Sequence, residues 1–132
     1  MSRRSARKNA FTLLFQMEFH DEYERVKEMF FMEQEEPVSE AEKSYITDAV
    51  EGTIAHEKEI DEIIDSCAKG WNTARMNRVD LAILRLAVYE MEYSKTAPLG
   101  VIINEAVELA KKFSSDEAPS FVNGILGKIA AK

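Results

Sequence analysis

The stretch VDLAILRLAVYEM, residues 79–91, decides the fold class. It is apolar nearly all round at helical spacing, and a helix of that kind is buried among other helices. We therefore expect a central helix over about residues 79–94. Arg85 interrupts its middle, and a buried arginine needs an anionic partner. We take Arg85 and Glu105 as a structural ion pair, with Glu90 as the other candidate acid and Asn104 or Asn123 as possible helpers.

Helical periodicity continues on both sides of this stretch, and no alternating run of β-branched residues occurs. Ser39 and Glu42 have the spacing of a capping box, Gly70 is a natural helix stop, and Pro98 suits a first helical turn. A connector with a short turn is expected from Trp71 to Arg78. The expected helices cover about residues 5–19, a stretch around 26–32, 39–54, 60–67 after a bend at 55–56, 79–94, 98–113 and 121–129.

The composition fits one domain, or two small helical bundles sharing a core, because the chain has 132 residues and is 45% hydrophobic. Cys67 is the single cysteine, which excludes an intrachain disulfide and fits a cytoplasmic protein. No apolar run approaches the roughly 20 residues that a membrane helix needs. The arginine-rich first ten residues also suit a transit peptide, but their pattern continues into a core helix.

The sequence assembles no catalytic set, so we expect no enzyme, no metal and no cofactor. His20 and His56 are the only histidines and form no HExxH pattern, and the glycines are too scattered for a phosphate loop. Cys67 lies on an apolar stripe, which favours a buried structural thiol. Glu105 and Glu108 share a helical face with neighbouring lysines, which favours ion pairing over acid–base catalysis.

The charge distribution points to an anionic ligand at one end of the chain. The net charge of −7 argues against a general nucleic-acid binder. However, four basic residues precede the first acid, Glu18: Arg3, Arg4, Arg7 and Lys8. Cations at a helix start oppose the helix dipole but form an anion site with the free N–H groups. Phe11 and Phe15 follow Arg7 at intervals of four residues, so they lie on the same side of the expected helix. Their rings either stack on RNA bases or fill the core. The alternative to an anion site is a helix start whose basic side chains are simply solvated.

A second basic cluster lies at Trp71, Arg75 and Arg78. A tryptophan beside arginines can bind RNA. We favour the other interpretation, in which Trp71 is a core residue that caps the helical bundle.

Four blocks of the sequence together resemble one family. The first is Arg3-Arg4-x-Ala6-Arg7-x-x-Ala10-x-x-x-Leu14-x-Gln16, and the second is Trp71-x-x-x-Arg75-x-x-x-Val79-Asp80-x-x-Ile83-Leu84-Arg85-x-Ala87-x-Tyr89-Glu90. The third is Val101-x-Ile103-Asn104-Glu105-Ala106-Val107-Glu108-Leu109-Ala110-Lys111-x-Phe113, and the fourth is Phe121-Val122-Asn123-Gly124-Ile125-Leu126. In this order and at these spacings, they resemble the NusB family of transcription antitermination factors.

The resemblance implies an all-α fold of seven helices in two roughly perpendicular three-helix bundles, as a single RNA-binding domain over residues 1–132. It implies binding to the boxA element of nascent ribosomal RNA transcripts, jointly with the small-subunit ribosomal protein NusE. The pair would act within a Nus complex on RNA polymerase that suppresses termination.

The resemblance also suggests site residues. The arm of Arg3, Arg4, Arg7 and Lys8 corresponds to the family's RNA-binding element. Phe15 stands where relatives often have tyrosine, and it lacks the hydroxyl. Ser120, Phe121 and Asn123 match a block close to the RNA surface. Tyr89 and Glu90 are our choices for the protein-partner interface.

Two alternatives remain open. The same domain occurs as the N-terminal module of certain rRNA cytosine methyltransferases, but no methyltransferase segment is present in these 132 residues. The other alternative is a helical protein-interaction or homodimer module without RNA binding. The acids crowded between Glu18 and Glu42 would favour a basic protein partner.

Overall fold

The computed structural model describes residues 2–132, which contain seven α-helices and no strand. The expected all-α class with seven helices is confirmed. The helices are α1 (Arg3–Gln16), α2 (Tyr23–Met32), α3 (Glu40–Ala55), α4 (Glu57–Cys67), α5 (Arg78–Tyr89), α6 (Leu99–Phe113) and α7 (Ala118–Ala130). A 3-10 turn, η1 (Thr73–Arg75), precedes α5, and a π-helical turn, η2 (Glu90–Ser94), follows it.

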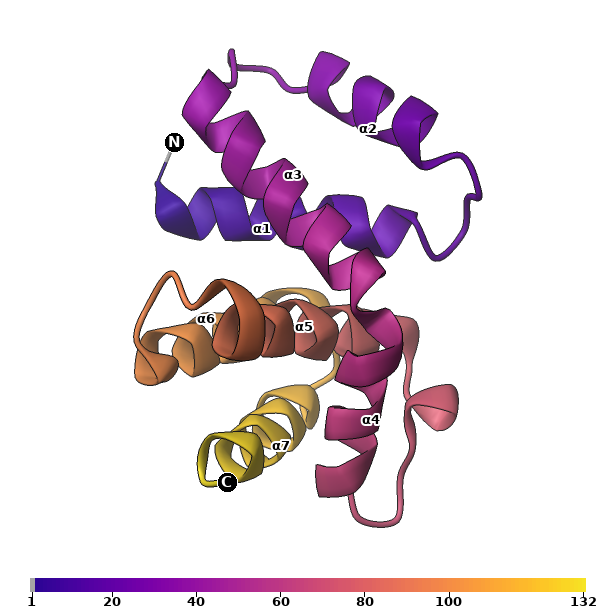
Figure 1. The fold of residues 1–132 in the computed structure, drawn as a ribbon, viewed down its shortest axis with the longest axis vertical. Helices are drawn as coiled ribbons and strands as arrows, with labels where there is room; N and C mark the ends of the chain where they lie inside the picture. The colour runs from indigo at the N-terminus through magenta and orange to yellow at the C-terminus, as the bar shows by residue number, and fades with distance from the viewer. Residues whose placement is uncertain (1) are drawn as a thin grey trace.

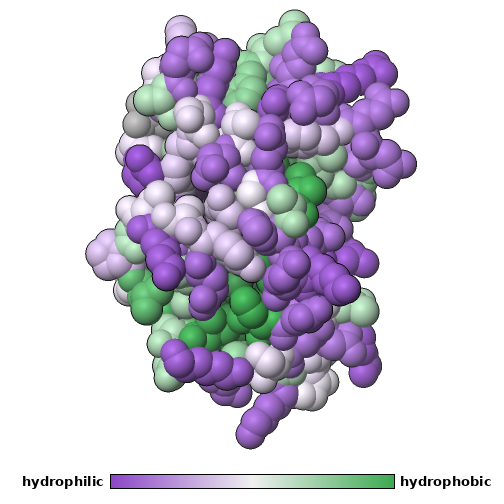
Figure 2. Space-filling model, in the orientation of Figure 1, coloured by the Kyte–Doolittle hydropathy of each residue, from purple (hydrophilic) through white to green (hydrophobic). Residues whose placement is uncertain are grey.

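The helices form two groups stacked on each other (Figure 1). Helices α1, α2 and α3 form one group, and α4 to α7 form the other. Helix α5 contacts α1, α3, α4, α6 and α7, so it is the common core of both groups. Every residue from 80 to 89 is buried, as the apolar stretch predicted. Figure 2 shows hydrophilic residues over most of one face, which fits an apolar interior.

Local signals explain several helix ends. Ser39 accepts a hydrogen bond from the backbone N–H of Glu42, and the Glu42 carboxylate accepts one from Ser39, so the predicted capping box is confirmed. Asn77 caps α5 in a similar way by accepting from the N–H of Asp80 at 2.8 Å. The predicted bend separates α3 from α4 at His56. No helix among residues 2–132 combines the length and apolar character that crossing a membrane requires.

The helix expected over residues 79–94 differs at its end. Regular α-helix stops at Tyr89, and the chain continues as the π-helical turn η2 until Lys95, which adopts a left-handed conformation at φ 48°. A π turn is a wider helical turn, and such turns are frequent at functional sites. This one carries the buried carboxylate of Glu90.

Arg85 is buried and ion-paired as expected, but the expected partner Glu105 is wrong. Its guanidinium donates two hydrogen bonds of 2.8 Å to Asp61 on α4, and its Nη1 lies 2.8 Å from a Glu18 oxygen. Glu57 lies 3.1 Å away. Glu90 is also not its partner, because five residues along a helix turn the side chain by roughly 140°. Arg85 therefore ties α5 to α4 and to the end of α1.

Candidate nucleic-acid interface

The basic arm is the first turn of α1. The Ser2 hydroxyl caps the helix by accepting a hydrogen bond from the Ser5 N–H at 3.1 Å. The first turn contains no acid, and Arg3 and Arg4 are exposed, while Lys8 is partly exposed. Positive side chains therefore surround the free N–H groups of the helix start, an arrangement that suits an anion.

Arg7 does not belong to this exposed set, which corrects the expectation. Only 5% of it is exposed, and its Nε donates to both oxygens of Glu90 at 3.0 and 3.2 Å. The Tyr45 hydroxyl donates to the same carboxylate at 2.5 Å. Burial, followed by the charge and hydrogen bond of Glu90, raises the pKa of Tyr45, which keeps the phenol neutral.

The helical spacing explains why Arg7 is buried. Ala10 and Leu14 follow it at three and seven positions, and both are core residues. Positions with that spacing share one helix face. Arg3 and Arg4 lie in the exposed first turn of α1, before the helix reaches the core, and Lys8 lies on the neighbouring side and is partly exposed. The spacing was visible in the sequence, but the run of basic residues at positions 3, 4, 7 and 8 obscured it.

Two exposed arginines are held by neighbours. The Arg4 Nε donates to the Glu105 carboxylate of α6 at 3.0 and 3.1 Å. The Arg3 guanidinium lies 4.1 Å from the centre of the Tyr45 ring, which is a cation–π contact. Both charged groups stay at the surface, so solvent screens these interactions. The arm is thus preorganised by its neighbours while its charge remains accessible.

Lys112 is a basic residue that the sequence analysis missed as a site residue. It lines a hollow of about 180 Å³ between α1 and α6, together with Arg4, Lys8 and the acids Glu105 and Glu108. Neither Lys8 nor Lys112 forms an ion pair within residues 2–132. The sequence shows only that Lys112 shares a face of α6 with Glu105, seven residues earlier; the packing of α6 beside α1 is what brings it to the arm. Lys112 supplies the accessible charge that Arg7 does not.

Aromatic rings lie along α1 beyond this hollow. Phe15 is partly buried, between Phe11 at 6.1 Å and Phe19 at 5.2 Å, measured between ring centroids. Phe11 also contacts Phe113 at the end of α6, at 5.2 Å. Phe19 and Phe113 are exposed. The Lys112 ammonium lies 5.5 Å from the centre of the Phe113 ring, and an exposed ring beside a cation is suited to stacking on unpaired bases.

The predicted block on α7 lies in its first turns. Ser120 and Asn123 are exposed, and Phe121 is partly buried. The Phe121 ring meets the Trp71 ring edge-on at 6.4 Å, and the Arg75 guanidinium lies 5.9 Å from the Trp71 ring centre. Trp71 is 52% exposed, so the expectation that it caps the core is wrong.

The end of α6 connects the α1 region with the block on α7. Phe113 contacts Phe11, and the adjacent Ser114 hydroxyl donates to Asp80 at 2.6 Å. Asp80 lines the same cavity as Phe121. A series of neighbouring contacts therefore runs from α1 to the start of α7.

Tyr89 and Glu90, expected at a protein interface, are interior residues. Glu90 is 2% exposed and is occupied by Arg7 and Tyr45. Tyr89 is buried and donates to Asp48 at 3.3 Å, and burial raises its pKa, with the Asp48 carboxylate adding to the effect. The burial of the apolar stretch continues through Met91, so both residues lie within the buried part of the chain. We withdraw them as partner contacts.

Comparisons with known proteins agree on one family. A sequence model of the NusB family matches residues 4–131. The transcription antitermination protein NusB of Agathobacter rectalis is 47% identical over 132 residues, covering 98% of this chain and 100% of the relative. The NusB of Acetivibrio thermocellus is 44% identical over 129 residues, covering 98% of this chain and 88% of the relative.

Solved structures are similar as well. A crystal form of NusB from T. maritima has a TM-score of 0.91 at 33% identity, covering 100% of this chain and 92% of that one. A crystal structure of antitermination factors NusB and NusE in complex with double-stranded RNA has a TM-score of 0.87 at 27% identity, covering 98% of this chain and 96% of that one. The sequence and fold together show that this chain belongs to the NusB family of transcription antitermination proteins.

Proposed function

We propose that this protein is an RNA-binding antitermination factor that holds the boxA element of nascent rRNA transcripts jointly with the ribosomal protein NusE. In this role residues 1–132 act as one RNA-binding domain in the cytoplasm, within a Nus complex on RNA polymerase. The action is binding rather than catalysis. The main support is the full-length similarity to a NusB crystallised with NusE and RNA.

We propose that the RNA backbone meets the surface formed by Arg3, Arg4, Lys8 and Lys112. All four side chains reach solvent at or near the start of α1, and phosphate contacts from such side chains fix the position of the strand. Arg7 acts behind this surface, because its buried bond to Glu90 fixes α1 against the π turn η2. It is a positioning residue and not an RNA contact.

Base contacts are proposed for the aromatic and polar residues. Phe15 is partly exposed on α1, while Phe121, Ser120 and Asn123 lie at the start of α7. Trp71 and Arg75 adjoin Phe121 and form an exposed ring-and-guanidinium pair. Single-stranded RNA is recognised by such stacking combined with hydrogen bonds to base edges.

A gel shift with boxA-type RNA, with and without NusE, tests the proposal. We expect specific binding that NusE strengthens, and loss of that binding in an Arg4→Ala/Lys8→Ala/Lys112→Ala variant with unchanged helical circular dichroism. No binding in the presence of NusE would support a protein-interaction or homodimer module instead.

A further inference from the structure

Helix α2 is poorly packed for its composition. Phe30 is its only buried residue, although the helix has ten residues. Helices of that length are not stable alone and depend on packing of an apolar face. Yet Met29 is 50% exposed, and Phe19 in the preceding loop is 62% exposed. Part of the apolar face of this region therefore lacks a covering partner.

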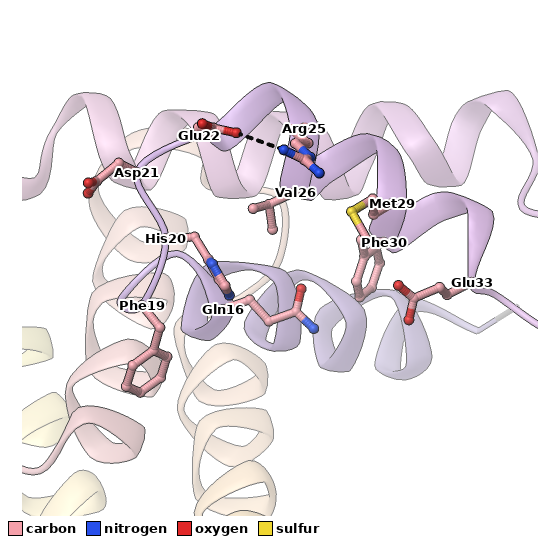
Figure 3. Close-up of a pocket in the computed structure, with 10 residues that line it drawn as sticks. All are labelled: Gln16, Phe19, His20, Asp21, Glu22, Arg25, Val26, Met29, Phe30 and Glu33. Atoms are coloured by element: carbon pink, nitrogen blue, oxygen red, sulfur yellow. Dashed lines mark ion pairs between the residues drawn. The ribbon is translucent and has the colours of Figure 1, made fainter.

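The uncovered side chains line a groove of about 630 Å³ between the end of α1 and α2. Figure 3 shows Val26, Met29 and Phe30 pointing from α2 toward α1, with Gln16 reaching toward them from α1. Methionine side chains are flexible and suit surfaces that accept a partner's apolar residues. The floor of the groove is thus built for apolar contacts.

The surroundings of the groove are strongly negative. Residues 16–36 contain eight acidic and two basic side chains, so they carry six of the seven net negative charges of the chain. Asp21 lies at one end of the groove and Glu33 at the other (Figure 3). The one arginine in the lining, Arg25, is paired with Glu22 at 3.5 Å.

The end of α2 adds to this negative potential. The last turn contains no basic residue, and Glu33 forms its C-cap. A carboxylate at a helix C-terminus opposes the helix dipole, so the acid is not there to stabilise the helix. A bound cationic group would be attracted both by Glu33 and by the free carbonyl groups of the helix end.

We propose that the groove between α1 and α2 docks a basic amphipathic helical segment of a protein partner, separate from the RNA-binding surface. Apolar side chains of the segment would cover Phe19 and Met29, and its lysines or arginines would face Asp21 and Glu33. The groove would repel RNA because of its charge. A second copy of this chain is a poorer occupant, because it too carries a net charge of −7 and would be repelled by the acidic surroundings of the groove.

A fluorescent amphipathic peptide of leucine and lysine, about 18 residues or five helical turns long, is a direct probe. Its anisotropy is titrated with the full-length protein at low salt. We expect saturable binding that an isomeric peptide with glutamate in place of lysine does not show. Equal binding of the glutamate peptide would overturn the proposal.

Two variants with matched controls locate the site. Phe19→Ser/Met29→Ser should lower the affinity for the lysine peptide by about tenfold, since two apolar contacts are lost. The control Met32→Ser lies on α2 but outside the groove, and it should change the affinity by less than about twofold. Equal affinities of the groove variant and the control would contradict the docking site.

Charge is tested by Asp21→Lys/Glu33→Lys against Glu59→Lys/Glu62→Lys, which makes the same net change on exposed positions of α4. The groove variant should bind about tenfold more weakly at low salt, and the difference should shrink at high salt. Equal weakening by both variants would mean non-specific attraction. Analytical ultracentrifugation completes the test: a dimer that Phe19→Ser/Met29→Ser dissociates would make a second copy the occupant and overturn the proposal.

Discussion

Replacing Arg7 by methionine separates the two roles of the basic residues of α1. Arg7 and Glu90 form an ion pair at 3.0 Å with side-chain exposures of 6% and 3%. Removing one member of a buried pair leaves an uncompensated charge and costs about 3–5 kcal/mol. Arg7→Met should therefore lower the free energy of unfolding by that amount. Arg4→Met should cost at most about 1 kcal/mol, because 65% of the Arg4 side chain is exposed.

Urea denaturation followed by far-UV circular dichroism measures the difference. With a slope of about 2 kcal/mol per molar urea, Arg7→Met should shift the midpoint by about 2 M, and Arg4→Met by less than about 0.5 M. A triple variant, Arg7→Met/Tyr45→Phe/Glu90→Leu, removes every polar group of the network and should recover much of the loss. A wild-type midpoint for Arg7→Met, together with lost RNA binding, would refute the positioning role and restore Arg7 as a direct contact.

Three further predictions follow from the same contacts. Glu105→Gln frees the Arg4 guanidinium for phosphate, so RNA affinity measured by anisotropy should rise about two- to fivefold, and an unchanged affinity would mean that Arg4 does not meet RNA. Gly52→Ala places a Cβ 2.2 Å from Cζ of Tyr89, which is too close for two carbon atoms, so the free energy of unfolding should fall by about 1–3 kcal/mol, and adding Tyr89→Leu to the same chain should recover part of the loss. Because the pKa of Tyr45 is raised in the folded protein, its contribution to stability is present at neutral pH and is lost as the pH rises above the ordinary phenol value of about 10. Tyr45→Phe should therefore reduce the fall in melting temperature at alkaline pH. An identical fall in the variant and the unmodified protein would exclude Tyr45 as its source.

The sequence predicted the helices well because periodicity and capping act locally. The stretch 79–91 predicted a buried helix, and Ser39 with Glu42 predicted a capping box. The partner of Arg85 was not predictable in this way, because Asp61 lies on another helix and only its packing brings it within 2.8 Å. The sequence shows that a buried arginine needs an acidic partner, but the chain contains twenty-four acidic residues and nothing local indicates which of them it is.

The site was predicted in outline and misjudged in detail. The basic arm was found from charge alone, yet charge does not distinguish the exposed Arg4 from the buried Arg7. Arg7 lies one turn further into the helix and shares a face with the buried Ala10 and Leu14, whereas Arg4 lies in the exposed first turn. Lys112 escaped notice because it joins the arm only when α6 packs beside α1.

The salt dependence of boxA RNA binding tests the central proposal most directly. Four accessible cations, Arg3, Arg4, Lys8 and Lys112, predict a slope of log affinity against log salt near −3 for a single strand. Alanine at Arg4, Lys8 and Lys112 together should reduce the slope to about −1. A slope near zero for the unmodified protein, or a slope that the triple substitution leaves unchanged, would contradict an RNA surface at the start of α1.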